Sequence, residues 1–317
     1  MKLNLKLKIS ILAAMVIALI AVFMLIKLGT NLEYILPRRF KKVLAIVLTG
    51  GAIAYSTMIF QTITNNRILT PSIIGLDSLY MLIQTIVIFV FGSMSLPNTN
   101  VKLNFIITIV IMMLFVTILY RFMFKREGRN LYFLLLVGLV LGTLFGSMST
   151  FMQVLIDPSE FLIVQDKMFA SFNNINTQLL TLASIILAAT ILYSMRFIKY
   201  LDVLAMGREH AVNLGVPYDY TVKRLLVVSA VLIAVSTALV GPITFLGLLV
   251  ANVAHQFMRT YKHTYLIAAS MLISMIALLG GQLIVERVFT FSTTLSVIIN
   301  FVGGAYFLYL LLKEAKA

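Results

Sequence analysis

The chain has 317 residues, of which 61% are hydrophobic and 11% charged, with a mean hydropathy of +1.04. Soluble domains carry about 45–50% apolar and about 25% charged residues, so this composition excludes an ordinary soluble protein and indicates a polytopic membrane protein. Cysteine is absent, which excludes disulfides and thiolate metal sites. The formal net charge of +14 fits basic cytoplasmic loops, and it does not require nucleic acid as a partner.

Ten segments are apolar enough to cross a bilayer, which takes roughly 20 residues in a helix. The first follows the basic residues 1–8 and is too long for a signal-peptide core, so we expect it to be retained. Gly241 and Pro242 split one apolar run, which leaves open two helices or one broken helix with a re-entrant piece. The predicted fold is one all-α transmembrane domain over residues 1–317. The segments are 9–28, 43–62, 76–92, 103–123, 131–155, 178–198, 223–240, 242–258, 264–285 and 295–312.

Lysine and arginine concentrate in the connections that ten spans place on the same side as both termini. Arg126 and Arg129 lie in one such connection, and Arg208 lies in another. The positive-inside rule therefore predicts that both termini are cytoplasmic. The basic residues within 38–42 lie on the opposite side and break this rule. Two interpretations stay open for them, snorkelling at a helix end and docking of an acidic partner outside the membrane.

Small residues recur at intervals of four in the fifth segment, at Gly138, Gly142, Gly146 and Thr150. On a helix they form one stripe that allows a neighbour to approach closely. The stripe predicts either packing within the chain or a surface at a subunit interface or translocation path. Gly303 and Gly304 in the last segment also permit close packing.

A polar island at residues 204–216 interrupts two long apolar segments. Gly207 and Gly215 punctuate it and Pro217 closes it. A short ordered element of this kind between spans predicts a surface where a partner docks.

The remaining polar residues suggest neither a metal site nor catalysis. Asn252 and His255 lie one turn apart and are interpreted as the polar inner end of the eighth segment. His210 and His263 lie among loop charges, where we expect them to be solvated. The chain has no constellation for nucleophilic or paired-carboxylate catalysis, so the sequence predicts no enzyme activity, no cofactor and no metal.

The charged residues also bear on the energy source. On this map they all fall in or near loops, whereas charges within the membrane usually mark a proton or ion path. This argues against an ion-coupled carrier. The chain has no Gly-x-x-x-x-Gly-Lys-Ser/Thr phosphate loop, so any ATP binds a separate subunit.

Four motifs, in order, resemble the permeases of ATP-driven iron–siderophore and vitamin B12 importers over essentially the whole chain. Residues 36–38 (Leu-Pro-Arg) resemble the end of that family's Arg-Leu-Pro-Arg motif. Residues 66–75 resemble its Asn-Pro-Leu-Ala-x-Pro-x-x-Leu-Gly loop. Residues 206–216 resemble its Leu-Gly-x-x-x-Ala-x-x-Leu-Gly-Val loop, and residues 241–248 its Gly-x-Ile-x-Phe-Val-Gly-Leu motif.

Three places depart from the family pattern. Ile35 replaces the first arginine of Arg-Leu-Pro-Arg, Ala251 and Asn252 begin a replacement of Pro-His-x-x-Arg, and residues 292–294 replace Glu-Leu-Pro. These departures resemble the branch that imports catecholate siderophores such as petrobactin, in which two different permeases often pair.

The resemblance implies a bacterial plasma-membrane permease for ferric siderophores. Its implied partners are a second permease, identical or different, two ATP-binding subunits and an external substrate-binding lipoprotein. Arg38, Arg39 and Arg287 would pair with carboxylates of that lipoprotein. The implied ATPase-coupling loop consists of Ala205, Met206, Gly207, Arg208, Glu209, Ala211, Leu214, Gly215 and Val216. A cobalamin or haem permease, an ion-coupled secondary transporter, and a membrane scaffold or enzyme remain as alternatives.

Overall fold

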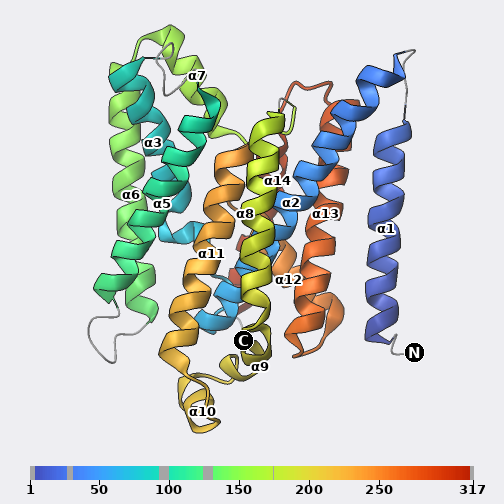
Figure 1. Ribbon diagram of the computed structural model, residues 1–317, viewed down its shortest axis with the longest axis vertical. Helices are drawn as coiled ribbons and strands as arrows, with labels where there is room; N and C mark the ends of the chain where they lie inside the picture. Colours follow the sequence, from blue (N-terminus) through green and yellow to red (C-terminus); the bar gives the residue numbers. More distant parts are fainter. Residues whose placement is uncertain (1–3, 27–30, 93–99, 124–130, 174, 315–317) are drawn as a thin grey trace.

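Helices form all of the regular secondary structure in the described part of the chain (Figure 1). The computed structural model describes residues 4–26, 31–92, 100–123, 131–173 and 175–314. Its elements are α1 (Leu5–Leu25), α2 (Leu32–Thr64), the 3-10 helix η1 (Pro71–Ile74), α3 (Leu76–Phe91), α5 (Val101–Met123), α6 (Leu131–Leu155), α7 (Pro158–Met168), α8 (Thr177–Met195), α9 (Ile198–Leu204), α10 (Arg208–Asn213), α11 (Tyr218–Val240), α12 (Leu246–Met258), α13 (His263–Arg287) and α14 (Leu295–Glu314).

A helix occupies each of the ten predicted segments, so the all-helical architecture is confirmed. Within the described residues, seven helices are long and apolar enough to cross a membrane: α1, α2, α5, α6, α8, α11 and α13. Three others are apolar but shorter, namely α3, α12 and the Leu295–Tyr309 part of α14. Arg126 and Arg129, which supported the predicted orientation, lie outside the described residues.

The long helix α2 forms the centre of the bundle and packs against α11, α12 and α13. Its side chains are mostly buried from Lys42 to Thr64. Buried hydroxyl groups link it to its neighbours. Tyr55 Oη lies 2.8 Å from Ser194 Oγ of α8, and Ser56 Oγ lies 2.6 Å from Ser229 Oγ of α11. These bonds satisfy polar groups that would be costly to bury alone.

The helical path is interrupted between α2 and α3, and this break lies deep in the bundle. Asn65 ends α2 in the left-handed region, with φ 48°, and Gly75 ends η1 with φ 89°. A Cβ added to Gly75 would lie 2.7 Å from Gly142 Cα. Because Gly142 is near the middle of α6, α3 begins about halfway along its neighbour.

A second break separates α11 from α12. Gly241 ends α11 with φ 97°, a conformation that favours glycine, and α12 begins only at Leu246. The open question about this region is therefore answered by two separate helices. Thr244 Oγ1 donates to Asp77 Oδ2 at 2.8 Å, so the two breaks meet. The sequence assigned Asp77 to the edge of a loop, but that loop lies inside the bundle.

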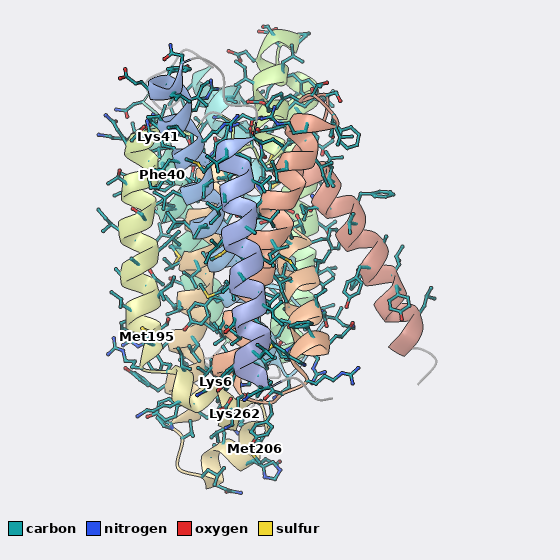
Figure 2. All side chains as sticks on the ribbon, turned by 90° about the vertical axis from the view of Figure 1, so that its right-hand side faces the viewer. Lys6, Phe40, Lys41, Met195, Met206 and Lys262 are labelled. Carbon is teal, nitrogen blue, oxygen red and sulfur yellow. The ribbon has the colours of Figure 1, made fainter. Side chains whose placement is uncertain are left out.

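The two ends of the bundle differ in the elements they carry (Figure 1). One end carries α9 and α10, and α1 begins toward it. The other carries α7 and the start of α2. Figure 2 shows Met206, Lys262 and Lys6 toward the first end, and Phe40 and Lys41 at the second. We call these the α10 end and the α7 end.

Candidate functional site: the coupling segment, the groove and the basic cluster

The coupling segment, residues 204–216, folds as a short helix closed by a glycine cap. Gly215 N donates to Val212 O and Val216 N to Ala211 O, both at 2.9 Å. This pair of bonds is the Schellman motif, with Gly215 in the left-handed position at φ 79°. The apolar contact expected of the motif is present, since Ala211 and Val216 are both buried.

The turn between α9 and α10 depends on Gly207. Its φ of 95° and ψ of 168° lie in a region that side chains with a Cβ rarely adopt. A Cβ at Gly207 or at Gly215 would meet nothing within 4 Å. Backbone conformation rather than space therefore requires glycine at both positions.

The nine predicted coupling residues divide into anchors and exposed side chains. Ala211 and Val216 are the buried anchors. Met206 is 57% exposed and Leu214 63% exposed. Ala205, Arg208 and Glu209 are also exposed. Val212, which the sequence did not single out, adds a third large apolar side chain at 50% exposure. The segment thus presents methionine, leucine and valine outward at the α10 end.

A buried histidine attaches α9 to the rest of the bundle. Asp202 Oδ1 accepts from the backbone N of His263 at 2.8 Å and lies 2.6 Å from His263 Nδ1. On the other side of the ring, His263 Nε2 lies 2.9 Å from Thr62 Oγ1. His263 is only 5% exposed, so the prediction that it is solvated was wrong. No local sequence signal pairs Asp202 with a histidine so far along the chain.

The small-residue stripe of α6 serves two purposes along its length. Gly138 and Gly142 lie against Ile74 and Gly75, where an added Cβ would come within 2.8 and 3.0 Å of main-chain carbon. Gly146 has open space instead. Gly146 and Thr150 line a groove of about 790 Å³ between α6 and the start of α3.

Among the described residues, the lining of this groove carries hydroxyl groups and no charged side chain. It consists of Ser72, Gly75, Ser78, Leu139, Gly142, Thr143, Gly146, Ser147 and Thr150. A second hollow of about 410 Å³ shares Thr150 and reaches Pro158 of α7. The two hollows therefore follow α6 from its middle to the α7 end.

The two glycines of α14 also differ in their surroundings. A Cβ at Gly303 would lie 2.5 Å from Phe245 Cβ, so Gly303 allows α14 to pack on the α11–α12 break. Gly304 would meet nothing within 4 Å. Only the first of the two is required by packing within the chain.

Two of the three predicted docking arginines bind the end of α1. Arg39 Nη1 donates to the carbonyls of Phe23 at 3.0 Å and Met24 at 2.8 Å. Arg287 Nη2 donates to Ile26 O at 3.3 Å. The last carbonyls of a helix have no partner within the helix, so both arginines satisfy them. Arg38 is exposed, and its Nη2 lies 3.5 Å from Asn173 O.

Beside them, Lys42 belongs to a polar network. Its Nζ donates to Glu286 Oε1 at 2.7 Å and to Asn173 Oδ1 at 3.1 Å. Gln282 Nε2 donates to the same two oxygens. Lys42 is therefore an internal strut between α2 and α13.

A second buried polar network lies at the α7 end. Lys167 Nζ donates to Gln84 Oε1 at 2.9 Å, and Gln84 Nε2 donates to Thr108 Oγ1 at 2.9 Å. Burial lowers the pKa of Lys167 to about 8, and the nearby Asp166 carboxylate partly opposes this change. Elsewhere in the described ranges, no group of three or more histidine, aspartate or glutamate side chains is arranged to hold a metal ion.

Comparison with known proteins agrees with this architecture. The chain is 66% identical over 312 residues to the petrobactin import system permease protein YclO of Bacillus subtilis (strain 168), covering 98% of this chain and 99% of that protein. It is 36% identical over 282 residues to the petrobactin import system permease protein FatC of Bacillus anthracis, covering 88% and 79%. An inward-facing ABC transporter of known structure superposes with a TM-score of 0.85 at 19% identity, covering 98% of this chain and all of that chain, which shows a shared fold.

The family model of the FecCD transport family matches residues 7–313. This match spans nearly the whole described bundle, including the coupling segment, the groove and both ends. The protein belongs to the FecCD transport family.

Proposed function

We propose that this chain is the permease subunit of an ATP-driven importer for ferric siderophores of the petrobactin type. The observation that carries this proposal is the near full-length identity to a petrobactin import permease. In this reading ten helices cross the bacterial plasma membrane, both termini are cytoplasmic, and residues 1–317 form a single domain. The α10 end then faces the cytoplasm.

The coupling segment is the docking site for an ATP-binding subunit. Its exposed Met206, Val212 and Leu214 are apolar side chains outside the apolar part of the bundle, where a protein partner would bury them. Glycine-dependent closure of α10 holds these side chains in one fixed arrangement. Two such ATPases, one for each permease, supply the energy for transport.

The groove along α6 is part of the translocation path. Its hydroxyl-rich lining suits a hydrated cargo, and the groove is open along one side, which a second permease would complete. Whether that partner is identical or different, its contribution would enclose the path. Gly146 and Thr150 are the stripe residues that face the cargo.

At the α7 end, an external substrate-binding lipoprotein docks. Among the three predicted docking arginines, Arg38 is the one whose exposure suits pairing with a partner carboxylate. Arg39 and Arg287 contribute indirectly, because they fix the end of α1 beside it.

Transport by the complete importer in lipid vesicles tests this function. The permease is reconstituted with its ATPases and lipoprotein, and uptake of radioactive iron is measured as a catecholate chelate, a hydroxamate chelate and haem, with labelled cobalamin as a fourth cargo. We expect ATP-dependent uptake of the catecholate chelate. Preferred uptake of haem or cobalamin would support the alternative permease assignments.

The energy source is tested in the same vesicles. Uptake should stop with a hydrolysis-deficient ATPase and continue with a protonophore. The opposite pattern would show an ion-coupled secondary transporter and would overturn the proposal.

A further inference from the structure

A chain of hydrogen bonds connects α9, which leads into the coupling segment, to the central helix α2. It runs from Asp202 through the ring of His263 to Thr62, with distances of 2.6 and 2.9 Å at the two ring nitrogens. Thr62 Oγ1 in turn donates to Met58 O at 2.7 Å, one turn earlier in α2. Three helices, α9, α13 and α2, therefore meet at one imidazole ring.

The donors and acceptors on the two sides of the ring are matched. The Asp202 carboxylate can only accept, so His263 Nδ1 donates to it. The Thr62 hydroxyl can donate or accept, so it serves as the partner of His263 Nε2. The ring is held by a carboxylate on one side and a hydroxyl on the other.

A helix cap alone does not explain this arrangement. Asp202 caps α13 by accepting from the backbone N of His263, and that bond needs no imidazole. The ring adds the connection to α2, which the cap does not require. Burial of the ring makes this connection important, because a buried polar atom left without a hydrogen-bond partner is destabilising.

We propose that Asp202, His263 and Thr62 form a joint that transmits movement of α9 to α2 and α13 during transport. This inference rests on the proposed docking of an ATPase at the coupling segment. The three are positioning residues, since they touch neither ATP nor cargo. When the ATPase displaces α10 and α9, the joint moves the ends of α2 and α13 that lie at the α10 end.

The surroundings leave room for such a movement. A cavity of about 670 Å³ adjoins the joint and is lined by Thr62, Asp202 and His263 together with Arg67, Met206 and His255. Interiors are otherwise close-packed and transmit displacement between rigid elements. The joint thus forms a stiff contact beside a space into which the coupling segment can shift.

Conservative variants separate the joint from the cap. Thr62→Val keeps the side-chain volume but removes the hydroxyl, whereas Thr62→Ser keeps it. His263→Ala keeps the backbone cap of α13 but removes the ring. We expect uptake in Thr62→Val and His263→Ala to fall about tenfold, the equivalent of one lost hydrogen bond, while ATPase binding stays unchanged and ATP hydrolysis continues. Thr62→Ser should transport normally.

Fluorescent labels report the transmitted movement directly. The natural chain has no cysteine, so Lys199→Cys on α9 and Phe40→Cys at the far end of α2 can each be labelled alone; Figure 2 labels Phe40. Both parent side chains are exposed, and Lys199 lies outside the coupling segment. In the complete importer, ATP should change both signals with the unaltered joint and with Thr62→Ser. With Thr62→Val or His263→Ala, the Lys199→Cys signal should persist and the Phe40→Cys signal should be lost.

The two possible failures are distinguishable. If the Phe40→Cys signal and uptake persist in Thr62→Val and His263→Ala, the joint is overturned and Asp202 is only a helix cap. If ATP leaves the Lys199→Cys signal unchanged even with the joint intact, the docking role of the coupling segment is overturned, and the joint with it.

Discussion

The predicted docking residues at the two ends of the bundle have opposite surroundings. At the α7 end, Arg39 and Arg287 are bound to the carbonyls of α1. At the α10 end, Met206 and Leu214 flank α10 and remain exposed, and the C-terminal end of that helix is closed by its own backbone bonds. The first set has an internal explanation and the second has none.

This difference shows which kind of surface cluster supports the presence of a docking partner. Charged groups near a helix end are readily satisfied by its free carbonyls, so a basic cluster alone is weak support for a partner. Exposure of large apolar side chains on a short, capped polar element does not stabilise the free subunit, so it indicates a surface that a partner covers. The coupling segment is therefore the stronger docking candidate, and five predictions test the contrast.

The largest effect should follow Gly215→Pro. Proline fixes φ near −65°, whereas Gly215 has φ 79°, and it removes the N–H that donates to Val212 O. A cost of about 3 kcal/mol would reduce the population of closed α10 roughly a hundredfold. Uptake by vesicles should fall accordingly while the subunit still inserts. Gly304→Ala, which enters open space, is the matched control; normal uptake in Gly215→Pro would refute the docking role.

Leu214→Asp should weaken the ATPase complex without unfolding the permease. Leu214 is 63% exposed, so the change costs little in the free subunit. Burial of an apolar anchor at an interface is typically worth about 2 kcal/mol, and its loss should raise the Kd roughly thirtyfold. Titration of ATPase onto detergent-solubilised permease measures this. Affinity equal to that of Leu214→Met would argue against an apolar interface.

Arg39→Ala should reduce stability, whereas Arg38→Ala should not. Arg39 makes two charge-assisted bonds to α1, worth about 1.5–3 kcal/mol together, whereas Arg38 is exposed and its contact with Asn173 O is long. The midpoint of thermal unfolding in detergent should therefore fall only in Arg39→Ala. Equal midpoints in the two variants would mean that α1 does not depend on this bond.

Arg38→Glu should weaken capture of the loaded lipoprotein by a factor of a few, since exposed ion pairs contribute about 0.2–1 kcal/mol. The effect should be greatest at low ionic strength, where screening is weakest. Binding of the lipoprotein to vesicles at two salt concentrations measures it. Binding that is unchanged at low salt would leave Arg38 a snorkelling residue.

The last prediction concerns the pH dependence of stability. Burial lowers the pKa of Lys167 from the ordinary 10.5 to about 8, so the unfolded chain binds more protons between these values. Stability should accordingly rise as the pH increases from about 8 toward 10.5. Lys167→Gln should reduce that rise in the thermal midpoint, and Lys262→Gln, at an exposed position, should not. A rise of the same size in Lys167→Gln would mean that other groups cause the pH dependence of the thermal midpoint.

The helical segments could be predicted because hydrophobicity along the chain determines them directly. The depth at which these helices begin and end within the bundle could not be predicted. Gly75 and Asp77 read as the end of a loop at the membrane boundary, yet contact between Gly75 and Gly142 places them halfway along α6. Residues 242–245 read as the start of a helix, but the φ of Gly241 turns them into a connection.

The site was predictable where its signal is local. Gly207 and Gly215 stand out because backbone conformation demands glycine. His263 and Asp202 form their pair only after α9 and α13 have packed, so their neighbours in sequence suggested a solvated histidine. Arg39 likewise looked available for a partner, because the carbonyls of α1 that it binds carry no sequence signal.

The uncharged lining of the groove has a consequence for how such importers diversify. Serine and threonine hydroxyls can donate or accept, so Ser72, Ser78, Thr143, Ser147 and Thr150 do not favour one sign of charge. As the proposed translocation path, such a lining should tolerate many chelates of similar size. Under that proposal, evolution or engineering could redirect the importer to a new iron source by exchanging the lipoprotein alone, with the membrane subunit left as it is.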